Sequence, residues 1–185
     1  MFKKILNLGI VFALASTMGC GGWSYLKTSK TQTLNKNYSF QTPQGWMELK
    51  FGNQYTMTRD SVSLQSIKVA FLDKKKALEN IKQEYPENAL SFEFAELYLA
   101  EFKKINESIN IELMENMPVT VAGQDGFRLH LKTQNNNGVA YQIIITGLAT
   151  KEGLYTLTYE APTIRYFDMD IENYERVTKS FVKKT

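Results

Sequence analysis

The sequence predicts an α+β fold in which an antiparallel β-sheet is flanked by α-helices. Two patterns support this prediction. Strand-like runs occupy residues 38–71 and return after Ile109, whereas other stretches repeat their apolar residues every three or four positions. Turn-forming residues join neighbouring strand-like runs, which favours antiparallel pairing. Helices that cover such a sheet form an α/β/α sandwich.

The first third of the predicted domain is rich in β-strands. Its strand-like runs contain many aromatic and β-branched residues and cover residues 38–40, 46–50, 54–59 and 62–71. Pro43 and Gly45 break the chain after the first run. Trp46 follows this break directly, and we expect its side chain to be buried against the helices.

Two helices are expected next. Asp73 is a candidate N-cap for a helix over residues 74–85, which Pro86 would end. Ser91 is a candidate N-cap for a second helix that extends to Ile105, because apolar residues recur there at steps of three or four. This second helix is amphipathic, so its apolar stripe is expected to face the core.

The C-terminal half returns to strands and ends in a helix. The strand-like runs cover residues 109–113, 127–131, 139–148 and 154–159. Hairpin turns are expected at residues 136–138 and 151–153, and residues 123–126 are also interpreted as a turn. A closing helix is expected from Phe167, with acidic residues in its first turn and lysines at positions 179, 183 and 184 at its end.

The N-terminus carries the pattern of an export signal. Lys3 and Lys4 precede an apolar stretch over residues 5–15, and small residues lead from it to Cys20. The apolar stretch is shorter than the roughly 20 residues that a membrane-spanning helix needs. The sequence therefore predicts that residues 1–19 are a cleaved signal peptide.

Cys20 is the only cysteine in the chain and the predicted site of lipidation. Exported cysteines usually pair in disulfides, so a single cysteine at the end of an export signal needs another explanation. The stretch Thr17-Met18-Gly19-Cys20 resembles the lipobox of bacterial lipoproteins, although leucine is preferred at the position of Thr17 and a small residue at that of Met18. An Asp after the cysteine is associated with inner-membrane retention. This chain has Gly21 there, which favours the periplasmic face of the outer membrane.

A flexible tether is expected over residues 20–36, starting with the lipidated cysteine. The polar residues of this segment show neither helical nor strand periodicity. A flexible chain of this length would hold the domain roughly 20 to 25 Å from the lipid. The globular domain is then expected over residues 37–185, anchored to the membrane by lipid and not embedded in it.

Composition and charge are those of an ordinary globular protein and argue against nucleic acid as a partner. Hydrophobic residues make up 43% of the chain and charged residues 22%, which is ordinary for a globular protein. Removal of Lys3 and Lys4 with the signal peptide lowers the formal net charge from +3 to +1. Because nucleic-acid binders usually carry a strongly basic stripe, we expect no nucleic-acid partner.

The chain is poor in catalytic and metal-binding residues. It holds one histidine and one cysteine, from which neither a zinc cluster nor a cysteine nucleophile can be assembled. His130 alternates out of phase with Phe127, Leu129 and Leu131, so it should lie on the opposite face of the sheet as a surface or packed residue. We therefore expect no cofactor, no metal site and no enzymatic activity.

Two groups of carboxylates were weighed as acid–base pairs or calcium ligands. Glu112 and Glu115 belong to one strand-like run, and Asp168, Asp170 and Glu172 begin the closing helix. Helix capping and solvation explain both groups, so neither is predicted to be a site.

Several fragments resemble PsbP-like proteins, and they occur in the order found in that family. The opening fragment, Tyr38-Ser39-Phe40-Gln41-Thr42-Pro43-Gln44-Gly45-Trp46, is an aromatic strand followed by Pro-x-Gly-Trp. The C-terminal fragments are Gly138-Val139-Ala140-Tyr141, Gly153-Leu154-Tyr155-Thr156-Leu157, Ala161-Pro162, Tyr166-Phe167 and Val177-Thr178-Lys179-Ser180-Phe181. The resemblance implies an antiparallel sheet flanked by helices, a fold shared with the Ran-binding Mog family.

The resemblance implies little about activity. PsbP proteins of plants are extrinsic subunits of photosystem II that help to retain calcium and chloride, and cyanobacterial relatives look like lipoproteins with the same kind of anchor. Metal ligation in the plant proteins relies on histidines and acidic residues. This chain has only His130, so no metal site is carried over.

Two classes of function fit these observations. The first is a non-catalytic accessory or binding module of the bacterial cell envelope that recognises an unknown protein partner. The alternative is a carrier of small apolar ligands, with a pocket between sheet and helices lined by Trp46, Phe71 and Tyr141. A carrier needs a cavity of about 300 Å³ or more, whereas a binding module needs a surface patch.

Overall fold

The computed structural model describes residues 22–184. The strands are β1 (Ser24–Tyr25), β2 (Thr31–Leu34), β3 (Tyr38–Gln41), β4 (Met47–Phe51), β5 (Gln54–Thr58), β6 (Ser66–Asp73), β7 (Ile111–Val121), β8 (Gln124–Gln134), β9 (Ala140–Thr150), β10 (Gly153–Pro162) and β11 (Val182–Lys183). The helices are α1 (Ser91–Ile105) and α2 (Tyr166–Lys179). The predicted signal peptide over residues 1–19 and the predicted lipidation site Cys20 lie outside the described residues.

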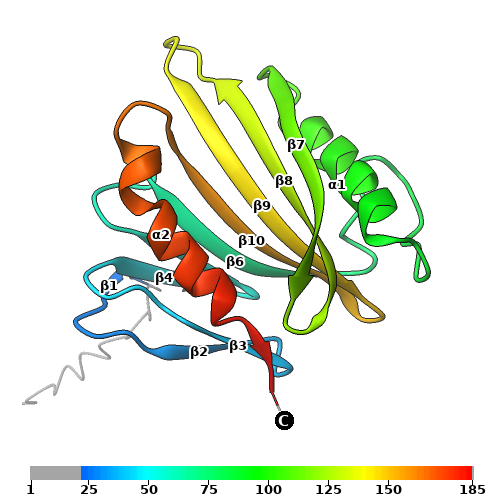
Figure 1. Ribbon diagram of the computed structural model, residues 1–185, viewed down its shortest axis with the longest axis horizontal. Coiled ribbons are helices and arrows are strands. Elements are labelled where there is room, and N and C mark those ends of the chain that lie inside the picture. The colour runs from blue at the N-terminus through cyan, green and yellow to red at the C-terminus, as the bar shows by residue number, and fades with distance from the viewer. Residues whose placement is uncertain (1–21, 185) are drawn as a thin grey trace, which may run out of the picture.

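One large antiparallel sheet forms the centre of the structure (Figure 1). Its eight strands run in the order β1-β4-β5-β6-β10-β9-β8-β7. Strands β4 to β6 form one meander and β7 to β10 another, and the two meet where β6 pairs with β10. A second sheet of three strands, in the order β11-β3-β2, brings the C-terminal strand beside an N-terminal one.

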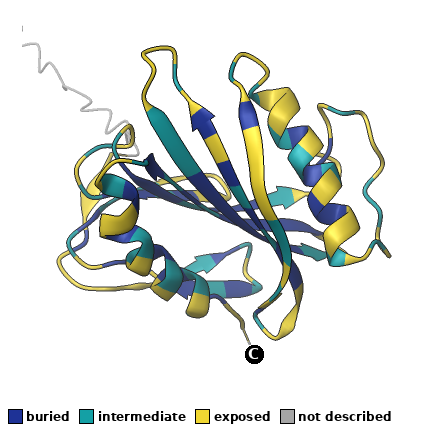
Figure 2. Ribbon diagram, turned by 45° about the horizontal axis from the view of Figure 1, so that its top comes forward, coloured by how far each residue is buried: buried dark blue, intermediate teal, exposed yellow. Residues whose placement is uncertain are grey.

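The two helices cover opposite faces of the large sheet. Phe127, Leu129 and Leu131 pack in one core with the buried side chains of α1, while Arg128 bonds to Glu175 on α2. Figure 2 shows the strands buried at the centre and the outer sides of both helices exposed. This arrangement confirms the predicted α+β fold, an antiparallel sheet flanked by helices.

The core beneath α2 is rich in aromatic residues. Tyr155, Tyr159 and Tyr174 are fully buried there, together with Phe181, which follows the helix. Trp46 belongs to the same core and is 1% exposed, which confirms its predicted burial.

The predicted tether is wrong for the part of it that the structure describes. Within residues 22–36, β1 pairs with β4 and β2 pairs with β3, and the side chains of Leu26 and Leu34 are buried. The folded domain therefore includes residues before position 37. Strand β1 has two residues and pairs with β4 further along the chain, whereas β2 has four residues and forms a hairpin with β3 through a turn at Asn35 and Lys36. Neither strand is long enough to show a clear period.

The predicted helix over residues 74–85 is also wrong, because residues 74–82 form turns and residues 83–85 have no regular structure. The buried carboxylate of Glu101 on α1 accepts hydrogen bonds from the backbone amides of Asn80 and Ile81, each at 3.0 Å, and from the Asn80 side chain. Lys82 has a φ of 55°, outside the helical region. The side chain of Glu101 on α1 therefore holds this loop in place, and the loop does not form the regular backbone hydrogen bonds of a helix.

Two smaller differences concern the C-terminal half. The turn expected at residues 123–126 lies at Ala122 and Gly123, whose φ angles are 50° and 75°, and Gly126 is inside β8. The closing helix ends at Lys179, so the other two lysines expected at its end lie outside it. Lys183 belongs to β11, and Lys184 follows that strand.

Candidate functional site

His130 lies on the face of the sheet that α2 covers, as its alternation predicted. Its Nε2 atom lies 2.8 Å from Oε1 of Gln142, and its ring stacks parallel to Phe167 with 5.8 Å between the ring centres. These contacts are those of a packed histidine that bridges the sheet and the first turn of α2.

The two carboxylate groups behave differently. Glu112 and Glu115 are exposed on β7, and the strand register shifts between Leu113 and Glu115. Asp170, however, is completely buried, so the expectation of a solvated first turn is wrong at this position. Its oxygens accept hydrogen bonds from Arg59 at 3.0 Å, from Gln65 at 3.2 Å and from Asn173 at 3.0 Å. Asp170 thereby fastens the loop before β6 to α2.

The residues expected to line a carrier pocket are not brought together in one. Trp46 and Phe71 are buried in the core, and the Tyr141 hydroxyl donates a hydrogen bond to the carbonyl oxygen of Ser63 at 2.9 Å. None of the three lines any of the cavities described next.

A groove lies at the end of the large sheet where β8 and β10 begin. It consists of three neighbouring cavities of about 610, 250 and 410 Å³. The first and second share Ala89 and Ala149, and the second and third share Ser91, Asp125 and Gly126. We call this continuous surface the groove. Residues 85–92 form one wall, residues from 118–126 and 149–152 form the other, and Asn37, Tyr38 and Lys183 close one end.

Tyr85 fixes the first wall of the groove. Its hydroxyl donates a hydrogen bond to the carbonyl oxygen of Gly153 at 2.9 Å and accepts one from the amide of Thr150 at 3.1 Å. Its ring packs on Phe94 of α1, with 5.0 Å between the ring centres. Burial raises the pKa of Tyr85 well above its usual range, so the hydroxyl stays protonated at neutral pH. The loop is therefore held in place although it has no regular secondary structure.

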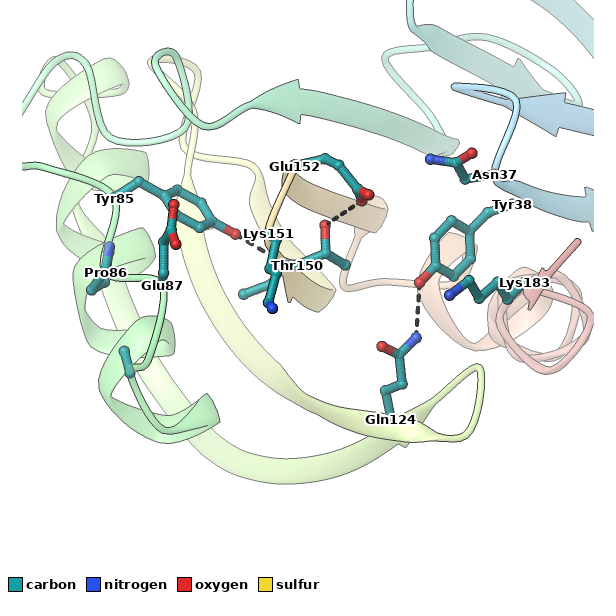
Figure 3. Close-up of a pocket in the computed structure, with 12 residues that line it drawn as sticks. Asn37, Tyr38, Tyr85, Pro86, Glu87, Gln124, Thr150, Lys151, Glu152 and Lys183 are labelled. Carbon is teal, nitrogen blue, oxygen red and sulfur yellow. Dashed lines mark hydrogen bonds between the residues drawn. The ribbon is translucent and has the colours of Figure 1, made fainter.

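Charged side chains surround the largest of these three cavities, as Figure 3 shows. Glu87 pairs with Lys74 at 2.9 Å, and the hydrogen bond from this lysine lowers the pKa of the Glu87 carboxyl. Lys151 and Glu152 extend from the hairpin between β9 and β10, and Lys183 comes from β11. A cavity of 610 Å³ meets the size that a carrier needs, but this lining does not suit an apolar ligand.

Apolar side chains mark the other end of the groove. Leu90 and Phe92 line the second cavity and are 59% and 49% exposed. Glu93 accepts a hydrogen bond from the amide of Leu90 at 3.0 Å and so orders the start of α1. Gly126 and Ala149, which have little or no side chain, line the facing wall. The groove thus joins a charged end to an apolar rim.

Two further observations concern the described residues 22–184. No three or more His, Cys, Asp or Glu side chains gather there in a way that could hold a metal ion. Neither helix of that region is long and apolar enough to cross a bilayer.

Sequence reasoning missed the groove because its lining comes from several segments that are distant in the chain. The exposed pair Leu90 and Phe92 was the only local signal, since both residues lie outside the apolar stripe that begins with Phe94.

Comparisons with known proteins agree with the fold. Among solved structures, the cyanobacterial PsbP of Synechocystis superposes with a TM-score of 0.60 at 15% identity, covering 92% of this chain and 99% of that one. The Ran-binding protein Mog1p of Saccharomyces cerevisiae gives a TM-score of 0.53 at 12% identity, over 83% and 94% of the two chains. A Pseudomonas aeruginosa protein of unknown function, described as a putative regulator, gives 0.51 at 10% identity, over 85% and 98%.

No curated protein matches the sequence. The profile of the PsbP family, however, matches residues 29–182, which is most of the chain and includes part of the segment first interpreted as a tether. The family profile and the structural comparison with the cyanobacterial PsbP cover the same part of the chain. The chain belongs to the PsbP family.

Proposed function

We propose that the protein is a non-catalytic lipoprotein of the bacterial cell envelope that binds a partner protein through the groove. The observation that carries the binding role is the exposure of Leu90 and Phe92 on the rim of a hollow with a small-residue wall. Single exposed apolar residues are common on protein surfaces. Two large ones beside a hollow form the kind of patch at which proteins recognise each other.

The chemistry of the groove favours a polypeptide over a small apolar ligand. A peptide carries both apolar side chains and a polar backbone with charged groups. The apolar rim at Phe92 can receive the former, and the charged end at Glu87, Lys151 and Lys183 can receive the latter. The fixed position of Tyr85 supports this role, because an ordered wall lowers the entropy lost on binding.

The fold is compatible with such a role. One solved structure of the same fold is a Ran-binding protein. At 12% identity this likeness concerns the fold alone, and it supports the proposal only in that this architecture carries a protein-binding surface elsewhere.

The envelope location rests on the N-terminal sequence. The basic residues, the apolar stretch 5–15 and Cys20 are those of a lipoprotein precursor. In this proposal the mature chain begins at Cys20, is held to the membrane by lipid on that residue and works at the periplasmic face of the outer membrane.

Site-directed photo-crosslinking in intact cells tests the binding role. A photoreactive phenylalanine analogue replaces Phe92 in one strain and Ile164 in another. Ile164 is a matched control because it is 85% exposed and follows the end of β10 that is remote from the groove. We expect one discrete adduct from position 92 that is absent from position 164.

The variant Leu90→Asp provides the second arm of this experiment. A charge on the rim should abolish the adduct at position 92 without lowering the melting temperature, because Leu90 is exposed. Identical adducts from both positions, or an adduct that survives Leu90→Asp, would contradict the proposed binding role.

A further inference from the structure

The folded domain begins very close to the proposed anchor. Ser24 is already paired with Glu48, and Tyr25 with Met47, in the large sheet. Four residue steps separate Cys20 from Ser24, which span at most about 14 Å when fully extended. An anchored domain therefore lies within that distance of the lipid at this edge, much closer than a flexible tether would hold it.

Exposed aromatic side chains gather at the same edge of the sheet. Trp23 is 41% exposed, Tyr25 57% and Phe51 84%. Phe51 lies at the tip of the hairpin between β4 and β5, directly before Gly52, whose φ is 55°. None of the three belongs to either buried core. Their exposure therefore has no explanation in the packing of the domain.

Strand register places these side chains on one face. Met47 is opposite Tyr25, and Phe51 follows Met47 by four positions along β4, so the three share a face of the sheet. Continued by one residue, the same register brings Trp23 opposite Leu49. The chain thus enters the domain alongside β4, from the direction of Phe51.

This part of the sheet face is left open by the helices. Helix α1 covers the same face but packs mainly over β7, β8 and β9. On the other face of β4, Glu48 is buried and accepts hydrogen bonds from Gln32 of the small sheet. Trp23, Tyr25 and Phe51 therefore belong to the uncovered side, toward the edge of the sheet opposite to Leu90 and Phe92 (Figure 1).

The chemistry of the patch suits the surface of a lipid bilayer. Tryptophan and tyrosine favour the membrane interface, since their rings are apolar and their N–H or O–H groups remain hydrated. Lys27 is exposed two positions after Tyr25 and can attract anionic headgroups. An anchor only a few residues away holds these side chains at the bilayer surface in any case.

We propose that Trp23, Tyr25 and Phe51 form a membrane-contact patch that lays the sheet edge of β1 and β4 on the bilayer. This inference rests on the proposed lipid anchoring, and it adds an orientation. The anchor sets the distance from the membrane, and the patch fixes which side of the domain faces it.

Tryptophan quenching tests the patch. The purified full-length product is reconstituted into vesicles of phosphatidylethanolamine and phosphatidylglycerol whose acyl chains are brominated, which quenches only tryptophans that reach the bilayer. The chain has two tryptophans, and Trp46 is a built-in control because it is 1% exposed. We expect the emission of Trp23 to be lost, and Trp23→Phe to remove the quenching.

Exposed-site variants separate the patch from general structural effects. Tyr25→Ser and Phe51→Ser should weaken the quenching of Trp23 without changing the melting temperature, whereas Ile164→Ser should change neither. Emission that is equally strong in brominated and unbrominated vesicles would overturn the patch.

Mass spectrometry of the N-terminal peptide keeps the two proposals distinguishable. A lipidated peptide without quenching leaves the anchoring intact and overturns the patch. If the peptide carries no lipid, the anchoring fails, and the patch is judged by the same quenching after mixing the chain with vesicles. Quenching in that mixture supports the patch, and its absence overturns it.

Discussion

The backbone amide of Leu26 donates a hydrogen bond to the carbonyl oxygen of Trp46 at 2.8 Å, and both side chains are buried in the same core. The amide of Gly45 returns a bond of 2.8 Å to the carbonyl oxygen of Leu26. The segment that follows the proposed anchor is thereby fixed to Trp46, which directly precedes β4. It contributes to the stability of the domain and is not a free linker.

Replacing Leu26 with alanine measures that contribution. Leu26 is fully buried, so Leu26→Ala should lower the free energy of unfolding by about 2–5 kcal/mol through lost burial and the cavity left behind. Denaturant titration provides the measurement. Lys27→Ala is the matched control. Lys27 follows Leu26 directly but is exposed, so its replacement should change the free energy of unfolding very little. Equal stability of Leu26→Ala and the wild type would restore the interpretation as a tether.

Gly147 is a position where the sheet tolerates no side chain. An added Cβ atom would lie 2.1 Å from a ring carbon of Phe127, the residue paired with it on β8. Gly147→Ala should therefore destabilise the domain by about 1–3 kcal/mol or more, as overpacking does. In the Gly147→Ala background, Phe127→Leu should recover part of the loss, which a double-mutant cycle measures. Strictly additive losses would show that the two residues do not compete for this space.

Buried tyrosines predict a loss of stability at alkaline pH. Burial raises the pKa of both Tyr98 and Tyr174 to about 12, above the value near 10 expected in the unfolded chain. Between these values the unfolded state releases protons that the folded state keeps, so unfolding becomes more favourable as pH rises. The stabilisation from these two tyrosines is complete below about pH 10 and decreases as the pH rises to about 12.

The slope of stability against pH measures this effect. Each such tyrosine should contribute up to about 1.4 kcal/mol per pH unit within that window. Tyr174→Phe should flatten the slope between pH 10 and 12, and an exposed control, Tyr25→Phe, should leave it unchanged. Identical slopes for the wild type and Tyr174→Phe would contradict the prediction.

Lipid attachment at Cys20 is directly testable in bacteria. Labelled fatty acid should be incorporated into the wild-type chain and not into Cys20→Ser, because the chain has no other cysteine. Immunoblotting of both chains controls for expression. Equal labelling of the two would refute the lipoprotein interpretation.

Local sequence patterns predicted those elements that are stabilised by their own neighbours. Helix α1 and the long hairpins of β8, β9 and β10 lie where the apolar periods and turn residues indicated them. In these elements, the side chains that show the period are also the ones that reach the core. The opposite faces of Leu129 and His130 followed from the same alternation.

The predictions failed where distant residues decide the structure. Glu101 accepts hydrogen bonds from the amides of Asn80 and Ile81, which in a helix over residues 74–85 would bond to carbonyl oxygens of the helix itself. Strand β1 has two residues, too few to show a period, and exists through its pairing with the distant strand β4. The groove likewise needs several distant segments, and the burial of Asp170 depends on Arg59, more than a hundred positions earlier in the chain.

The pairing of β6 with β10 determines when the protein can fold. Residues 74–152 lie between these two strands, so closing the sheet brings together parts of the chain that are remote in sequence, at a considerable entropic cost. The small sheet is completed later still, since Val182 and Lys183 pair with β3. In the export that we propose, the strands β1 and β4 to β6 would emerge before β10, which pairs with β6. The chain could complete its fold only after its last residues had followed, so the topology suits translocation in an unfolded state.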